Sequence, residues 1–299
     1  MDAQGYNEST VTGLVKGSID THIHSGPDVI PRKVDDLSLA KEAAMAGMRG
    51  LIIKCHVSPT EGRAYLVQKI VPEVKIFGGI ALNSSIGGLN PEAVQISVRM
   101  GAKIVWMPTT SALSHVQNLA LSDFLKSMGG GIKEKGITIF NEDGKLKEEV
   151  YEILKIVKES RIILATGHLS PKESSSLIAE ALRHGIEKIL VTHPEGHITF
   201  FTMEEQKTLA AKGIYFERCW SVTTGLGGEK ARLSPEVLAI AIKTVGAATT
   251  VMATDLGQIV NPTPPEGMRE YIAAMLRLGI TPKEIERMVK FNPAQLLDI

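Results

Sequence analysis

The stretch Ile19-Asp20-Thr21-His22-Ile23-His24 begins as an apolar, strand-like run and ends in a pair of histidines. Three later apolar runs, 162–168, 189–193 and 251–255, end in His168, His193 and Asp255. Side chains two positions apart on a strand point to the same face, so His22 and His24 can face inward together. If these strands belong to one closed parallel sheet, all five side chains meet at one end of it.

Short apolar runs alternate with helical stretches along the whole chain. We expect strands near residues 18–24, 50–56, 75–82, 103–108, 161–166, 188–193, 213–219 and 249–255. The runs are mostly continuously apolar, as in parallel strands that are covered on both faces. Eight strands, each followed by a helix, fill the length of an α/β protein of the (β/α)₈ TIM-barrel type.

The alternative architecture is an open doubly wound sheet. Such a sheet would place its first and last strands far apart, and His22 and Asp255 could not then share one site. We therefore predict a single barrel domain over residues 1–299, with its core at about 18–290. In that fold the active site lies at the C-terminal strand ends, where these side chains fall.

Helix boundaries are marked by capping residues. Asn90 and Pro91 predict the start of a helix that Gly101 ends. Three predicted helices begin with capping-box spacing, at Ser170 with Glu173, Thr202 with Glu205, and Thr281 with Glu284.

The segment 109–160 is far longer than a simple connection. It contains a β-like run at 137–140. An insertion on this face could be a lid or a contact between two copies, and a purely structural excursion fits equally well.

Composition restricts the class of protein. The 33 basic residues balance the 33 acidic ones without a basic stripe, which argues against nucleic acid or an anionic membrane as a partner. The polar opening at 1–12 lacks the apolar core of a signal peptide, and no apolar run reaches the length of a membrane span. Two cysteines, Cys55 and Cys219, cannot form a disulfide framework, and both lie in predicted strands. We expect a cytoplasmic protein whose cysteines act as buried apolar residues.

Neutral imidazole and carboxylate are ligands of a borderline cation such as zinc. A lone histidine after a strand is more often a core or loop residue. Here four histidines and one aspartate all lie at the C-terminal ends of predicted strands, which favours a metal site. Zinc is the expected ion, and manganese, iron or nickel also suits these ligands.

These residues resemble the amidohydrolase superfamily. The resemblance includes the stretch 20–24, the surroundings of His168 and His193, which are similar to phosphotriesterase-like members, and the Asn292-Pro293-Ala294 sequence near the end. It implies that the five polar side chains at the strand ends bind a divalent metal: His22, His24, His168, His193 and Asp255. It also implies that Asp255 takes a proton from the water that attacks the substrate.

The chain departs from the pattern of two-metal members of that group. Those members carry a carboxylated lysine or a glutamate at the end of strand four, where this chain has only 106–109, Trp-Met-Pro-Thr. Lys103 lies at the wrong end of that strand. We therefore expect one ion rather than two, and leave open a bridge from carboxylated Lys54 or from Glu142.

Strand two ends in Lys54 and His56, which share a face. A lysine within an apolar strand is costly unless it is paired or used. We expect Lys54 to contact an anion or carbonyl of the substrate and His56 to be a second donor, so that both are catalytic or substrate-binding. Alternatively, Lys54 pairs with a carboxylate and His56 caps a loop.

Glu217 ends strand seven. Substrate binding and a surface pair with Arg218 are equally consistent with its position. His115, in the long insertion, is a weaker candidate for the site.

The leading hypothesis is a metal-dependent hydrolase that acts on an amide, lactone or ester-like bond of a small molecule. A second is a metal-dependent decarboxylase or hydratase in which Lys54 holds a carboxylate. A third is a barrel that binds metal and ligand without catalysis. A homo-oligomer is compatible with each.

Overall fold

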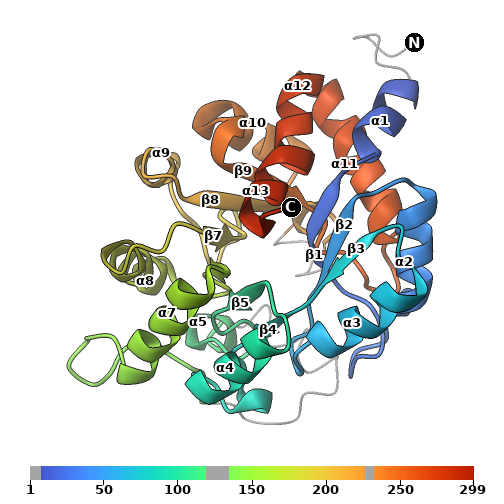
Figure 1. Ribbon diagram of the computed structural model, residues 1–299. Coiled ribbons are helices and arrows are strands. Elements are labelled where there is room, and N and C mark those ends of the chain that lie inside the picture. Colours follow the sequence, from blue (N-terminus) through green and yellow to red (C-terminus); the bar gives the residue numbers. More distant parts are fainter. Residues whose placement is uncertain (1–7, 119–134, 226–231) are drawn as a thin grey trace.

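The computed structural model describes residues 8–118, 135–225 and 232–299. Parallel strands form its centre and helices surround them (Figure 1). The strands are β1 Ile19–Ile23, β2 Gly50–Ile53, β3 Lys75–Phe77, β4 Gly79–Ala81, β5 Ile104–Trp106, β6 Ile163–Ala165, β7 Ile189–Thr192, β8 Tyr215–Cys219 and β9 Thr250–Ala253. Each lies within one of the eight predicted segments, and the predicted (β/α)₈ architecture is confirmed.

The strands pair in parallel in chain order, as β1-β2-β3 and as β4 through β9. The last strand also meets the first. Asp255 N donates to His22 O at 2.7 Å, and His24 N donates to Leu256 O at 2.8 Å. Because the first and last strands are neighbours, the open doubly wound alternative is wrong.

The predicted strand 75–82 is divided at Gly78 into β3 and β4. A Cβ at Gly78 would lie 2.3 Å from the backbone nitrogen of Glu61, so only glycine permits this close approach to the start of the preceding helix, Glu61–Ile70. The hydroxyl of Thr60 accepts from Gly79 N at 2.9 Å and donates to Ile53 O at 2.7 Å. The Thr60 side chain thus links β2 to β4, where backbone hydrogen bonds of the sheet are missing.

The helices are α1 Glu8–Val15, α2 Asp36–Met45, α3 Glu61–Ile70, α4 Pro91–Arg99, α5 Leu113–Val116, α7 Glu148–Ser160, α8 Pro171–Arg183, α9 Met203–Ala210, α10 Pro235–Val245, α11 Pro264–Arg277, α12 Pro282–Glu286 and α13 Asn292–Leu297. Short 3-10 turns occur at η1 Ser84–Ile86, η2 Trp220–Thr223 and η4 Ala247–Thr249, and η5 Arg287–Phe291 is a π-helical turn. The predicted capping boxes begin α8, α9 and α12. Asn90 accepts from Ala93 N at the start of α4, also as predicted.

Apolar side chains fill the interior of the ring of strands. This inner cluster is fully buried and includes Ile19, Ile52, Ile104, Trp106, Ile163, Leu190 and Val251. Two larger clusters lie between the strands and the helices. The interior is therefore a packed core, and the polar side chains gather above it at the C-terminal strand ends.

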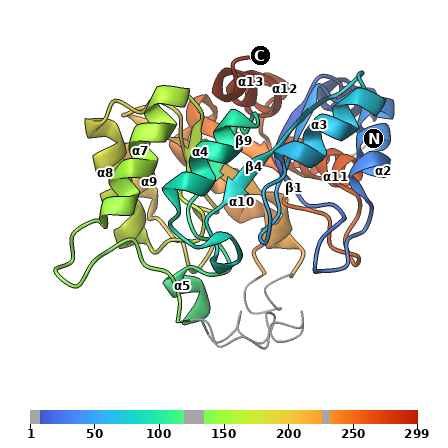
Figure 2. The same ribbon diagram turned by 60° about the horizontal axis from the view of Figure 1, so that its bottom comes forward.

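The long insertion contributes α5 and then α7, which takes the place of the helix after β5. Figure 2 shows α5 on the opposite side of the barrel from α12 and α13. The predicted β-like run 137–140 forms only isolated bridges, between Ile137 and Ala112 and between Phe140 and Leu146. Residues 119–134 lie outside the described part of the chain.

Within the described ranges, the helices are all too short or too polar to cross a bilayer.

Candidate metal centre

Three predicted ligands form a tight group at the mouth of the barrel. Nε2 of His22 lies 3.1 Å, and Nε2 of His24 3.0 Å, from Oδ1 of Asp255. One ligand atom from each of the three lies within 4.8 Å of the others. His193 is beside them, with Nε2 3.7 Å from Oδ2 of Asp255. Two imidazoles and a carboxylate, all buried, suit a divalent cation such as zinc.

His168, the fifth predicted ligand, lies at the edge of this group. Its ring centroid is 5.5 Å from that of His193. Its Nδ1 is 2.9 Å from Nδ1 of His115, and these two rings stack with centroids 4.9 Å apart. His115 therefore holds His168, a contact between residues 53 positions apart that local sequence does not indicate.

Two of the candidate ligands have left-handed backbone conformations. The φ angle is 52° at His193 and 51° at Asp255, a region that residues other than glycine seldom adopt. Backbone hydrogen bonds hold both, from His193 N to Glu217 O and from Asp255 N to His22 O. Strain of this kind concentrates at functional sites, because the surrounding fold must impose it.

Asp255 and His22 are each oriented by a further buried side chain. Ser221 Oγ donates to Oδ2 of Asp255 at 2.6 Å. Oε2 of Glu217 lies 3.0 Å from Nδ1 of His22, and Thr21 Oγ1 donates to Oε1 of Glu217 at 2.7 Å. Both oxygens of Glu217 therefore have partners within the protein.

The alternative surface pair between Glu217 and Arg218 is wrong. Both side chains are completely buried, and Arg218 pairs with Glu195 on the outer side of β8. Successive residues of a strand point to opposite faces, which separates these neighbours. Substrate binding by Glu217 stays a prediction.

Lys54 and His56 both lie within the centre. Nζ of Lys54 is 3.0 Å from Nε2 of His22 and 5.4 Å from the ring centre of Trp106. Nδ1 of His56 is 2.9 Å from Thr109 Oγ1, and its ring centroid is 4.9 Å from that of His24. The predicted pair thus stands beside the three-ligand group.

Burial and charged neighbours together set the protonation of the centre. Burial opposes protonation of His22, but Asp255 and Glu217 outweigh it and raise the pKa of this imidazole. Burial lowers the pKa of His24 to about 3 and that of His193 to about 4, and it lowers the pKa values of His56 and His168 well below their usual range. It also lowers the pKa of Lys54. Burial opposes ionisation of Asp255, but His22 and His24 outweigh it and hold the pKa of this carboxyl well below its usual value. At neutral pH Asp255 is therefore ionised and His24 and His193 are neutral, as metal ligands require.

Arg32 was not indicated by the sequence. It lies in the loop after β1, where NH2 is 2.8 Å from Oδ2 of Asp28 and 3.3 Å from Nδ1 of His24. An arginine in a polar loop carries no local signal of such a contact. It places a buried positive charge beside Nδ1 of His24.

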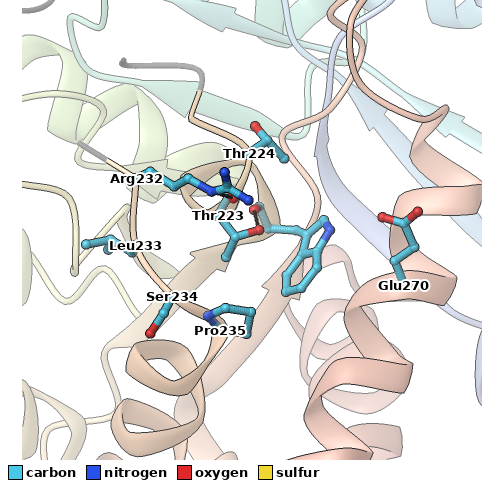
Figure 3. Close-up of a pocket in the computed structure, with 8 residues that line it drawn as sticks. Thr223, Thr224, Arg232, Leu233, Ser234, Pro235 and Glu270 are labelled. Atoms are coloured by element: carbon cyan, nitrogen blue, oxygen red, sulfur yellow. Dashed lines mark hydrogen bonds between the residues drawn. The ribbon is translucent and has the colours of Figure 1, made fainter. Parts of the chain in front are cut away.

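A cavity of about 530 Å³ lies beside the mouth, between the turn after β8 and helix α11 (Figure 3). It is lined by Trp220, Thr223, Thr224, Arg232, Leu233, Ser234, Pro235 and Glu270. None of these residues belongs to the candidate metal centre. Ser221, in the same turn, connects the cavity wall to Asp255 through its hydrogen bond.

Comparison with known proteins gives a family and a fold. The model of a family of unknown function (DUF6282) matches residues 17–217. No protein with curated annotation matches the sequence. Among solved structures, an amidohydrolase from Pseudomonas aeruginosa is similar with a TM-score of 0.62 and 14% identity, over 96% of this chain and 98% of that one.

Two further structures are similar over almost the entire chain. A probable dipeptidase from Pseudomonas aeruginosa has a TM-score of 0.62 at 10% identity and covers 98% of each chain. A 2,6-dihydroxybenzoate decarboxylase has a TM-score of 0.56 at 12% identity, over 95% of this chain and 100% of that one. At these identities the likeness shows the fold alone, which is the fold expected from the predicted resemblance to the amidohydrolase superfamily.

Proposed function

The chain belongs to the family of unknown function DUF6282, and we propose that it is a metal-dependent hydrolase that cleaves an amide, lactone or ester-like bond of a small molecule. One observation carries the proposal. Asp255 contacts the Nε2 atoms of both His22 and His24 through a single oxygen, and all three side chains are buried at the C-terminal strand ends.

His22, His24 and Asp255 would hold the cation, with His193 beside them and His168 at the edge. A divalent cation bound there makes water more acidic and polarises a carbonyl oxygen. Zinc is the expected ion from this donor set. The residues fit the ion, because burial keeps His24 and His193 neutral and the neighbours of Asp255 keep it ionised. Asp255 and Glu217 raise the pKa of His22, which would give up a ring proton on binding the cation.

Asp255 accepts the proton of the attacking water in this proposal. Its Oδ1 faces the two histidines and its Oδ2 accepts from Ser221, so the carboxylate is held in one orientation. Lys54 and His56 stand on the β2 side of the group and would hold the carbonyl or an anionic group of the substrate. Because the base is already oriented next to the water that it deprotonates, little entropy is lost in reaching the transition state.

We propose that one ion occupies this centre. Strand β5 ends at the fully buried Trp106 and offers no carboxylate there, and Glu142 is exposed on a turn. Two cations about 3.5–4 Å apart without an anionic bridge would repel strongly in a partly dry site. Carboxylated Lys54 is the bridge that the centre could still accommodate.

A decarboxylase or hydratase is the second candidate. Lys54 and Arg32 place two basic side chains beside the same histidines, which suits a substrate carboxylate. A decarboxylase is also among the structures of similar fold. A barrel that binds metal and ligand without turnover is the third candidate.

The test compares metal-free and zinc-reconstituted protein on a panel of lactones, N-acyl amides, aryl esters and aromatic carboxylates. Turnover that depends on the metal and incorporates ¹⁸O from labelled water into a new carboxylate supports the hydrolase. Release of carbon dioxide supports the lyase instead. Stoichiometric zinc with no turnover on any member of the panel would favour the binding barrel.

A further inference from the structure

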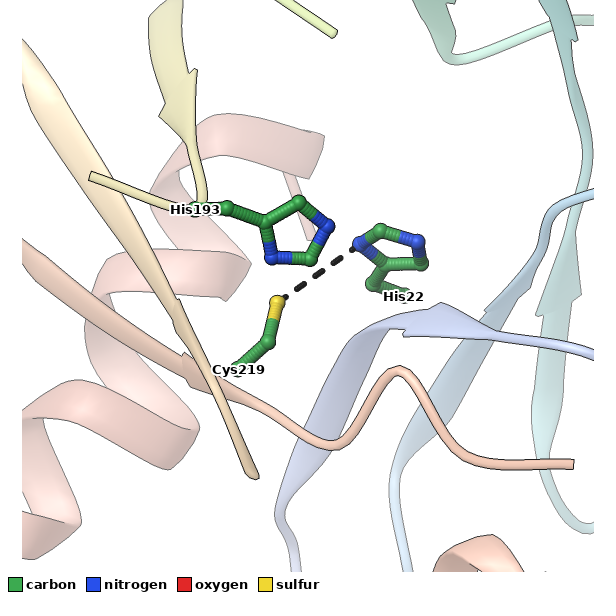
Figure 4. A group of neighbouring side chains, drawn as sticks. All are labelled: His22, His193 and Cys219. Carbon is green, nitrogen blue, oxygen red and sulfur yellow. Dashed lines mark hydrogen bonds between the residues drawn. The ribbon is translucent and has the colours of Figure 1, made fainter. Parts of the chain in front are cut away.

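Cys219 ends β8 directly beneath the rings of His22 and His193, on the core side of the candidate metal centre (Figure 4). Its Sγ lies 3.7 Å from Nδ1 of His22, and one ligand atom from each of the three residues lies within 4.8 Å of the others. We propose that Cys219, His22 and His193 form a second metal site, here called the inner site, which takes a soft divalent cation. It is an alternative to the centre that contains Asp255.

The distances suit one ion. Zinc binds imidazole nitrogen at about 2.0–2.1 Å and thiolate sulfur at about 2.3 Å, which at a tetrahedral angle places the two ligands roughly 3.6 Å apart. The observed separation between Sγ of Cys219 and Nδ1 of His22 is 3.7 Å. A thiolate with two imidazoles is a donor set that favours zinc, cadmium or copper over magnesium or calcium.

His193 supplies an independent observation. Its Nδ1 is buried and has no hydrogen-bond partner among the residues that the structure describes. Figure 4 shows one ring nitrogen of His193 turned toward Cys219. Buried polar atoms nearly always have a partner, and a cation between the thiolate and the two rings would be one.

The charge around the inner site also favours a cation. Oε2 of Glu217 lies 3.0 Å from the same nitrogen of His22, so a carboxylate stands beside the position of the ion. Cys219 itself is 1% exposed, and its contacts are the long ones to His22 and to Glu217 O at 3.9 Å. Binding releases the thiol proton to solvent, as at other thiolate sites.

His22 makes the two sites exclusive. A neutral imidazole has one free lone pair. With Glu217 accepting from Nδ1, the lone pair is on Nε2, which lies near Asp255 and 3.0 Å from Nζ of Lys54. An ion at the inner site takes Nδ1 instead, and the ring proton moves to Nε2, where Oδ1 of Asp255 accepts it at 3.1 Å. A soft cation in the inner site therefore removes His22 from the catalytic centre and inhibits the enzyme; this last consequence rests on the proposed function.

The experiment titrates metal-free protein with Co²⁺ and follows the near-ultraviolet charge-transfer absorption of a cobalt–thiolate bond. We expect the band in the wild-type protein and in Cys55→Ser, and its loss in Cys219→Ser. Cys55 is the matched control, because it is also buried, at 3% exposure, but follows β2 and contacts Ser58. His24→Ala should keep the band, since it removes a ligand of the other centre only.

Absence of the band in the wild-type protein at saturating Co²⁺, or an undiminished band in folded Cys219→Ser, would overturn the inner site. A thermal melt of each variant identifies any that fails to fold, and His24→Ala then still tests the site. Zinc-dependent turnover without a thiolate band removes the inner site alone. A thiolate band in the wild-type protein leaves the inner site in place, and absence of metal-dependent turnover in folded Cys219→Ser, which lacks that site, removes the proposed function.

Inhibition provides the second measurement. The Cd²⁺ concentration that inhibits the zinc-loaded wild-type enzyme should be at least about tenfold lower than the concentration that inhibits Cys219→Ser. Removal of one of three ligands lowers the affinity for the ion by roughly that factor or more. Equal sensitivity of the two proteins to Cd²⁺ would contradict the exclusive use of His22.

Discussion

Oε2 of Glu217 lies 3.0 Å from Nδ1 of His22, and both side chains are fully buried. A carboxylate in this position keeps the ring proton on Nδ1 and directs the lone pair of Nε2 toward Asp255. It also makes the imidazole more basic, as in other carboxylate–histidine–metal arrangements. Glu217 is therefore a positioning residue for the proposed metal ligand, and Thr21 positions Glu217 in turn.

We predict that Glu217→Gln weakens zinc binding by about 10- to 100-fold, the usual effect of removing such a partner. The amide can still accept from Nδ1 but loses the charge. Competition with a chromophoric chelator measures the affinity. Glu61→Gln is the control, since Glu61 is also buried but lies at the start of α3. Unchanged zinc affinity in Glu217→Gln would show that His22 does not bind through Nε2.

Asp255→Asn should lower turnover by about 10²- to 10⁴-fold while much of the metal stays bound. The amide keeps an oxygen for coordination but cannot take a proton at neutral pH. Rate and metal content are measured on the same preparation. Asp143→Asn, on an exposed turn, is the control. Near-normal turnover in Asp255→Asn would mean that another group is the base.

The double variant His22→Ala/His24→Ala should instead lose the metal. Two of three neighbouring ligands are removed, and a site with one remaining ligand binds zinc at least about 100-fold more weakly. Elemental analysis after dialysis gives the result. His184→Ala serves as the control, since His184 lies at the surface end of α8 and pairs with Glu180. Full metal content in the double variant would mean that the metal binds at another site.

The metal-free protein should become less stable as the pH falls from 6.5 toward 4. Burial lowers the pKa of His193 from 6.5 to about 4, so in this window the unfolded chain binds more protons than the folded one. The free energy of unfolding therefore rises with pH, by up to about 1.4 kcal/mol per pH unit for one such histidine. Urea denaturation of wild type and His193→Gln at several pH values measures the slope. The variant should have the flatter dependence, and identical slopes would argue against a neutral His193.

Saturated protein should contain one metal ion per chain. The proposed centre and the inner site share His22 and His193, and no carboxylate at the end of β5 bridges a pair of ions. Anomalous diffraction at the zinc edge locates the ions directly. Two strong peaks at bridging distance, with Lys54 modified between them, would establish a two-metal centre in place of the single one.

Local sequence was sufficient for much of the fold. The apolar runs predicted all eight strand positions, and the caps at Asn90, Ser170, Thr202 and Thr281 predicted four helix starts. Periodicity and capping depend on residues a few positions apart, which is why a single sequence reveals them. The same holds for the side chains at the strand ends, because a parallel barrel brings those ends together.

The partners of those side chains were decided only by the tertiary structure. His115 stacks on His168, Glu217 turns to His22 rather than to Arg218, and Cys219 faces His22 rather than serving only as apolar filling. Each contact joins residues 53 or more positions apart. It depends on the stagger between strands and on which side chains of β8 point inward. The sequence of β8 carries an apolar and a charged residue on each face and does not specify that register, so only closure of the barrel determines it.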